Sequence, residues 1–248
     1  MGRKGEKKHR KRINAPKSYS IPRKHGKFII RALPGTHPTI ESIPLLIIIR
    51  DVLHYAKTAK EAKIIICGGS VLVDGVIRTN PKFSVGLMDV LSFPEINRHY
   101  RMIAKGGRRK IGLLPINEKE KDSKLCKIKS KSVVKGGKVH FALHDGRSIV
   151  LSQEDTPNWR VGDTLLIKIP DQEVLDHIPR EEGNYTLITG GSNTGFLGTL
   201  ESIEKRIGRH KSLATIRDQD TVTRTSLEYV FPVGIEKPIL QLKASEEV

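Results

Sequence analysis

Lysine and arginine crowd the first 31 residues of this chain, which hold twelve cations against a single acid, Glu6. The segment therefore carries +11 of the formal net charge of +17. Cations at this density suit phosphates, because they displace the counterions that condense on a nucleic acid. The candidate contacts in this N-terminal segment are Arg3, Lys4, Lys7, Lys8, Arg10, Lys11, Arg12, Lys17, Arg23, Lys24, His25 and Lys27.

The N-terminal segment holds few apolar residues, so it cannot bury a core of its own. Pro16, Pro22 and Gly26 interrupt any regular helix there. We expect an extended arm that has no fixed structure alone, becomes ordered only against folded RNA, and can be deleted without unfolding the rest. The alternative is a solvated tail that serves solubility.

Further cations in the chain also have spacings that suit phosphates, and the last group mixes arginine with an aromatic ring, as RNA-binding surfaces do. A solvated helix face and a charged linker are the alternatives. The candidates are Lys57, Lys60 and Lys63, which recur every three residues; Arg78 and Lys82, near a predicted hairpin; and Arg98, Arg101, Lys105, Arg108, Arg109 and Lys110, which surround Tyr100.

Signatures of common enzymes are missing from the sequence. Gly190 and Gly195 have the spacing of a phosphate-binding loop, but Phe196 and Leu197 stand where that loop needs Lys and Ser or Thr. Neither an HExxH nor a GxSxG pattern occurs, and the acidic pairs lie in polar stretches that would leave both carboxylates ionised. We therefore expect no catalytic residue.

The cysteines, the histidines and the hydropathy of the chain exclude further classes of protein. Cys67 and Cys126 cannot form a disulfide framework or complete a zinc site by themselves, and the histidines lack ligand spacing. The longest apolar run, Leu45–Ile49, is too short to cross a bilayer. We expect no metal, no cofactor, no membrane contact and a reducing, cytoplasmic location.

Two helices and a hairpin are predicted for the stretch that carries the lysine triplet. Ser42 is placed to cap a first helix whose apolar stripe reaches Ala56, although the run 45–49 could instead be a buried strand. Thr58 and Glu61 form a capping box for a second helix, which Gly68-Gly69 ends. Asp74-Gly75 between β-branched runs predicts a hairpin. Strands follow at 83–85 and 88–91.

The rest of the chain reads as β structure. Residues 118–132 are polar and predict a loop, whereas 133–170 show strand alternation around the Asp145-Gly146 turn. Trp159 is expected to fill a core. Residues 183–203 predict a glycine-punctuated hairpin, in which the glycines serve tight turns and close backbone approaches. Strands resume at 213–217 and 227–233.

Several of these motifs resemble known families. Residues 58–75, with the capping box followed by Gly69-Ser-Val-Leu-Val-Asp-Gly75, resemble the alpha-L RNA-binding domain. Tyr185–Ile203, with Gly190, Gly195 and Gly198, resembles a KOW motif. In order along the chain, the basic opening, the Lys24-His-Gly-Lys27 stretch and these two motifs resemble small-subunit ribosomal protein four of the archaeal and eukaryotic e-type. In the alpha-L loop, Asp74 stands where Asn is common.

This resemblance implies an α+β, multidomain fold: a basic extended N-terminal arm, a small α/β alpha-L RNA-binding domain, a central β domain and a C-terminal SH3-like (KOW) β barrel. The expected boundaries are 1–41, 42–97, 98–178 (including the basic linker), 179–242 and a 243–248 tail. It also implies a structural, non-enzymatic constituent of the small ribosomal subunit. Its partners would be ribosomal RNA and neighbouring ribosomal proteins, without free homo-oligomers.

Two other functions fit parts of the pattern. A KOW-containing translation or transcription factor would exchange on and off its machinery, so it would leave ribosomes at moderate salt. An RNA-modifying enzyme with an appended alpha-L domain would need a large catalytic domain, and only about 150 residues follow that segment. Turnover in a base-isomerisation assay on bare ribosomal RNA would identify the enzyme.

Overall fold

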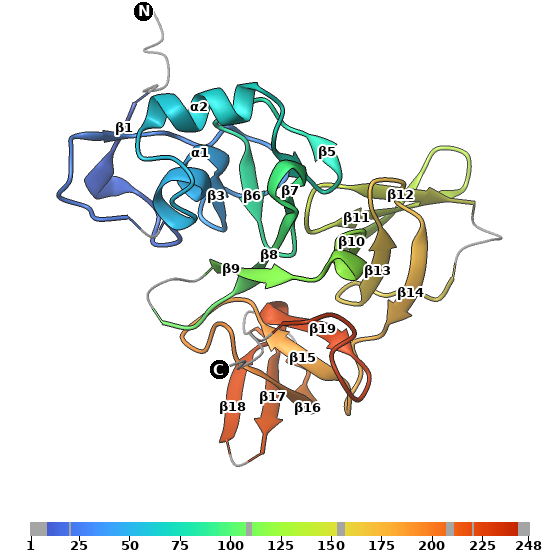
Figure 1. Cartoon of the computed structure of the whole chain (residues 1–248). Coiled ribbons are helices and arrows are strands. Elements are labelled where there is room, and N and C mark those ends of the chain that lie inside the picture. The colour runs from blue at the N-terminus through green and yellow to red at the C-terminus, as the bar shows by residue number, and fades with distance from the viewer. Residues whose placement is uncertain are drawn as a thin grey trace, which may run out of the picture.

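The structure, a computed structural model, describes residues 9–19, 21–107, 111–152, 157–206, 211–219 and 221–242. β-strands are the main regular structure of these residues, and they form three five-stranded antiparallel sheets and two short strand pairs (Figure 1). The helices gather in the domain that follows the N-terminal segment. None of the described helices has the length and hydropathy needed to cross a membrane.

The N-terminal segment is folded from His9 onward. Strand β1 (Arg10–Lys11) pairs with β2 (Phe28–Ile29), and a 3-10 turn lies between them at Arg12–Asn14. Ala15 and Tyr19 are buried in the same apolar cluster as the first helix. The expectation of an arm without fixed structure is therefore wrong for these residues. Its few apolar side chains cannot form a core alone, but they complete a core that the next domain begins.

The first predicted helix exists but begins two residues later than expected, with Pro44 and not Ser42 at the capping position. Strand β3 (Ser42–Pro44) pairs with β6 (Ser84–Gly86), and the helix α1 (Leu45–Ile47) follows directly. Ser42 is therefore not a helix cap, and its hydroxyl instead donates to the carbonyl of Pro38 at 2.9 Å. Pairing with β6 therefore places Ser42 in a strand, although local sequence signals assigned it to the helix.

Helix α1 continues as a π-helical segment over Ile48–Val52, so the isoleucine-rich run is helix and not strand. Residues 45–49 are almost completely buried, and they form the centre of this domain's core. Helix α2 (Ala59–Cys67) begins at the predicted capping box: the Thr58 hydroxyl accepts from the amide of Glu61, whose carboxylate accepts from the amide of Thr58. Ala62 and Ile66 face the core.

The first large sheet has the order β5-β4-β7-β8-β9. Asp74 and Gly75 form the predicted turn between β4 and β5, both with positive φ. The basic cluster after residue 97 is not a linker where it is described, because β8 pairs with β7 over residues 98–101 and with β9 over residues 99–104. The strands of this sheet are β4 (Leu72–Val73), β5 (Val76–Ile77), β7 (Val90–Phe93), β8 (Arg98–Ala104) and β9 (Ile111–Ile116).

A second sheet, in the order β12-β11-β10-β13-β14, forms the central domain. The loop predicted for 118–132 is wrong, because β10 runs through most of it as the middle strand. The Trp159 ring packs edge-on against Phe141 at 5.2 Å, which confirms its predicted place in a core. The strands are β10 (Ser123–Val134), β11 (Lys138–Leu143), β12 (Ser148–Leu151), β13 (Thr164–Lys168) and β14 (Val174–Ile178).

The third sheet closes the chain in the order β18-β17-β16-β15-β19. The strand expected at 227–233 begins only at residue 230, after a 3-10 turn over Leu227–Tyr229. In Figure 1 this C-terminal domain lies at the opposite end of the molecule from α2. Its strands are β15 (Tyr185–Ile188), β16 (Leu197–Glu204), β17 (Leu213–Asp218), β18 (Thr221–Ser226) and β19 (Val230–Gly234).

A buried charge cluster joins the central domain to the first domain, which contains α1, α2 and the first large sheet. The Lys124 ammonium lies 2.6 Å from carboxylate oxygens of Asp74 and Asp89 and 3.0 Å from Asp145. Arg147 pairs with Asp74 at 3.0 Å. The hairpin residue Asp74 therefore does more than turn the chain: its negative charge holds two cations of the neighbouring domain, which an Asn there could not do equally well.

Candidate nucleic-acid interface

Lys60 and Lys63 lie on the exposed side of α2, and Lys57 precedes the capping residue Thr58. All three lysines are exposed, whereas Ala62 and Ile66 of the helix are buried in the core and Ile64 is exposed beside the lysines. The capping box fixes where the helix begins, and the helical repeat then places lysines three residues apart as neighbours. The predicted cationic face therefore exists as a geometric feature, and its contact with RNA stays a prediction.

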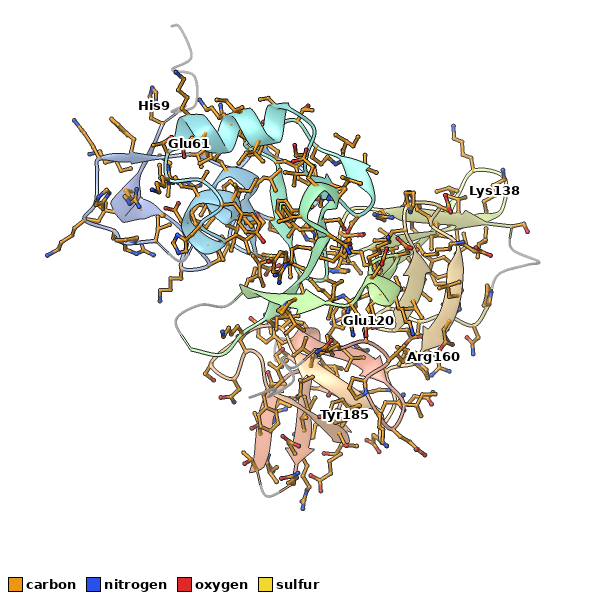
Figure 2. All side chains as sticks on the ribbon, in the orientation of Figure 1. His9, Glu61, Glu120, Lys138, Arg160 and Tyr185 are labelled. Atoms are coloured by element: carbon orange, nitrogen blue, oxygen red, sulfur yellow. The ribbon has the colours of Figure 1, made fainter. Side chains whose placement is uncertain are left out.

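Figure 2 shows the labelled His9, of the N-terminal segment, and Glu61, of α2, at the same end of the molecule. A cavity of about 580 Å³ opens between the segment and the first domain. Its walls bring together four cations from four separate places in the sequence: Arg12, Arg50, Lys63 and Lys82. Arg50 is absent from the candidates chosen by charge pattern, because it belongs to no basic cluster in the sequence; in the structure its guanidinium pairs with the carboxylate of Asp51 at 2.7 Å.

The arginines of the N-terminal segment also hold the segment together. Arg12 is only 8 % exposed, and its Nε donates to the carbonyl of Pro22 at 2.6 Å. Arg23 donates to the carbonyls of Ile13 and Ala15. Arg12 is therefore mainly a structural residue, although part of it lines the cavity. This corrects the prediction that its side chain is free to bind RNA. Lys11, Lys17, Arg23, Lys24, His25 and Lys27 are exposed and Arg10 is half-buried.

The two candidate cations near the β4–β5 hairpin, Arg78 and Lys82, have different roles. Lys82 is exposed beside the cavity. Arg78 is half-buried with its guanidinium 4.6 Å from the centre of the Phe83 ring, so part of its side chain packs the domain. The residues Arg3, Lys4, Lys7, Lys8, Arg108, Arg109 and Lys110, which sequence analysis also selected, lie outside the described residues.

Arg101 cannot serve as a nucleic-acid contact. Its side chain is fully buried, and its guanidinium pairs with Glu120 at 2.8 Å and donates to the carbonyls of Glu120 and Ser123. Burial lowers its pKa, while the Glu120 carboxylate opposes that shift. The partner lies nineteen residues away, so no local pattern could have shown it. Arg98 and Lys105, in contrast, are exposed.

Tyr100, which the sequence places inside the same basic cluster, packs edge-on against Phe93 and its hydroxyl lies 2.6 Å from that of Tyr55. Burial, with a smaller effect of the bond to Tyr100, raises the pKa of Tyr55 to about 12. The aromatic ring of the cluster therefore supports the domain, and its stacking on a base stays a prediction.

The glycines of the 183–203 hairpin serve the close approaches that were expected. A Cβ on Gly198 would lie 2.5 Å from the carbonyl oxygen of Arg217 in the neighbouring strand. Gly195, with φ of +87°, would meet the backbone of Gly106 at 2.6 Å. Gly190 lies under the ring of Tyr229, which a Cβ would approach to 2.6 Å. These positions exclude side chains because backbone or ring atoms fill the space.

One group of side chains has the composition of a metal site. Cys126, His144 and Asp145 bring their donor atoms within 4.8 Å of one another. His144 already uses both ring nitrogens, on the amide of Lys127 and the carbonyl of Leu87, and Asp145 is paired with Lys124. Burial raises the pKa of the Cys126 thiol well above its usual value. These donors are engaged within the protein, so the group does not fit a metal.

The fold and the cationic face together define a multidomain β protein of the nucleic-acid-binding kind, with its cations gathered around a helix and hairpin unit. Family models support this class: the RS4NT (NUC023) domain matches residues 4–39, the S4 domain residues 44–91, and Ribosomal family S4e residues 96–174. The chain belongs to ribosomal family S4e, because its relatives in that family are similar to it over almost its whole length.

Two such relatives are the small ribosomal subunit proteins eS4 of Methanocaldococcus jannaschii and Desulfurococcus amylolyticus. The first is 47% identical and covers 98% of this chain and 100% of its own. The second is 41% identical and covers 98% of both. A crystal structure of the 30S ribosomal protein S4e from Thermoplasma acidophilum has a TM-score of 0.68 at 31% identity, over 78% of this chain and 95% of that one.

Proposed function

We propose that this chain is a structural constituent of the small ribosomal subunit, where it supports translation by binding ribosomal RNA and performs no catalysis. The observation that carries the proposal is the cavity where Arg12, Arg50, Lys63 and Lys82 meet. Lys63 and Lys82 are exposed there. Arg50 is paired with Asp51, and Arg12 presents only one edge. Cations gathered in this way from distant parts of the chain, beside the exposed lysines of α2, are an electrostatic footprint for phosphates. The names of the relatives, which are proteins of the small ribosomal subunit, support the same conclusion.

Phosphate contacts of this kind position a protein on RNA without reading its sequence, and the shape of the RNA supplies the specificity. Because residues 9–19 and 21–41 are already packed on the S4 domain, they present their exposed cations with less loss of conformational entropy than a free arm would. The segment and α2 therefore act as one surface. Neighbouring ribosomal proteins are its further partners, and it works on cytoplasmic ribosomes without a membrane or a free homo-oligomer.

The C-terminal domain is proposed to be an SH3-like unit with a KOW motif. Its support is the five-stranded antiparallel sheet in which Gly190, Gly195 and Gly198 occupy crowded positions. A central β domain between two such modules would set their spacing on the RNA.

The test is the affinity of the full chain for small-subunit ribosomal RNA, measured over a series of salt concentrations. We expect Lys60→Gln with Lys63→Gln to weaken binding and to reduce the slope of log affinity against log salt by about 2, one for each phosphate that is no longer neutralised. The matched control is Lys135→Gln with Lys138→Gln, on the exposed β10–β11 turn. Equal slopes for the two double variants would refute the proposed surface.

A further inference from the structure

A second cavity, of about 800 Å³, lies where five parts of the chain meet. Its walls come from the N-terminal stretch at His37, from the first large sheet at Ala104, from β10 at Lys127, from the β14–β15 connection at Arg180, and from the C-terminal domain at Tyr229. A volume of this size accommodates a small ligand the size of a nucleotide. The lysine face of α2 contributes no residue to it, so it is separate from the cationic surface around that helix.

Cations outnumber acids on the walls of this cavity. Lys127, Lys129, Arg180 and Lys211 stand against Glu41 and Glu228, and Lys211 pairs with Glu228. Within the part of the chain that the structure describes, Lys127, Lys129 and Arg180 form no ion pair with a carboxylate. Three cations therefore face one acid in a partly enclosed space.

Two of these cations are held there at an electrostatic cost. The Lys127 ammonium donates to the carbonyls of Glu228, at 2.8 Å, and Val230, at 2.6 Å. Burial, and then repulsion from Arg180, lower the pKa of Lys127 to about 8. Burial also lowers the pKa of Arg180, and the nearby Asp163 only partly opposes it. A bound anion would remove this cost, because it would pair with both cations away from bulk water.

An aromatic wall lies beside the cations. The Tyr229 ring packs on the bare backbone of Gly190 and Gly191, which fixes the ring at the edge of the cavity. A side chain at Gly190 would push the ring away. Aromatic rings beside basic groups are how proteins hold single-stranded RNA, since every base has a face that can stack.

We propose that this cavity binds one nucleotide of single-stranded RNA, with its phosphate between Lys127 and Arg180 and its base against Tyr229. The inference rests on the proposed function, because it assumes an RNA partner, and it adds a second contact at the junction of the domains. A nucleotide in this place would touch the N-terminal segment, the central domain and the C-terminal domain together. Binding there would therefore hold the domains in one arrangement.

The first experiment uses the full chain and a short single-stranded oligouridine RNA that carries a photoreactive thiouridine. We expect crosslinks in the peptides that contain Arg180 or Tyr229. We also expect Arg180→Gln to reduce the salt slope by about 1, and Tyr229→Leu to weaken binding about 5- to 150-fold, the effect of losing one stacked base. Arg224→Gln, which removes an exposed arginine of the same domain outside the cavity, is the matched control.

Crosslinks confined to the N-terminal segment and α2, with no effect of Arg180→Gln, would overturn the inference and leave the proposed function standing. If the unsubstituted chain does not bind RNA at all, both the inference and the proposed function are overturned. Inorganic phosphate and a polyglutamate peptide are added as competitors to identify the source of the anion. If either one suppresses crosslinking at the cavity as strongly as unlabelled RNA does, the assignment to a nucleotide is also overturned. If Tyr229→Leu does not fold, the crosslink map and Arg180→Gln decide the outcome.

Discussion

Replacing Lys124 by Met tests the idea that a buried ion cluster joins the first two domains. Three carboxylates lie within 3.0 Å of the Lys124 ammonium, and Arg147 is the other permanent cation among them. Methionine fills a similar volume without charge, so Asp89 keeps His37 and the amide of Gly86 but loses the ammonium. Breaking a buried pair by removing one partner costs about 3–5 kcal/mol. That is a large share of the about 5–15 kcal/mol by which folded proteins are stable.

The same substitution has a signature in its dependence on pH. In the unsubstituted chain, Lys124 and neighbouring cations lower the pKa of Asp89 and bring that of Asp145 to about 2, against the opposing effect of burial. The stability these two groups contribute is present above the pKa of an unfolded aspartate, and is lost as the pH falls through the folded values. Burial raises the pKa of Asp74, which acts in the opposite direction.

Without Lys124, burial and mutual repulsion raise the pKa of these carboxylates in the folded state above the unfolded value. Protonation then favours the folded form at low pH, and this support is lost as the pH rises. We therefore expect the loss in Lys124→Met to be greatest near neutral pH and to shrink toward about pH 4, near the pKa of an unfolded aspartate. The assay is urea unfolding followed by Trp159 fluorescence over a pH series. The control is Lys119→Met, an exposed lysine on the same approach to β10. Equal stability of the two variants at neutral pH, or a loss that grows on acidification, would refute the reasoning.

Three further substitutions test particular contacts. Tyr19→Ala should lower the free energy of unfolding by about 3–5 kcal/mol, as loss of a buried aromatic ring does. Deletion of residues 1–31 should expose the same apolar surface to a hydrophobic dye. Unchanged stability in both variants would mean that the segment does not share the core. Gly198→Ala should cost about 1–3 kcal/mol, because its Cβ would meet the carbonyl of Arg217; a thermal melt identical to that of Gly35→Ala, whose Cβ would meet nothing closer than the Ser84 hydroxyl at 3.4 Å, would contradict this. Thr58→Ala should cost about 0.5–2 kcal/mol through loss of the cap, and amide exchange should rise in the first turn of α2 and nowhere else.

Local sequence patterns were sufficient for several elements. The capping box of α2, the Asp74-Gly75 turn and the core place of Trp159 were predicted correctly. Each depends on neighbours within a few residues or on the size of one side chain, so the sequence carries the necessary information locally. The hairpin glycines were also predicted to serve close approaches, although not which atoms they approach.

Predictions failed where a distant segment competes with a local signal. Ser42 was read as a helix cap, but pairing with β6 draws it into a strand. Residues 118–132 looked like a loop because of their polarity, yet β10 pairs with β13 over residues 123–127 and with β11 over residues 128–134. In both cases the hydrogen bonds that decide the conformation come from residues far away in sequence.

By itself, the sequence determined the excess of positive charge, the helix with its lysine face and the order of the motifs, because these follow from composition and from contacts three or four residues apart. Only the tertiary structure decided which cations remain free. Arg101, Lys124 and much of Arg12 are withdrawn from solvent, while Arg50 reaches the cationic cavity. The sequence cannot separate these roles, since the charge is the same in each. The difference lies in desolvation and in carboxylates and carbonyls that folding brings from tens of residues away.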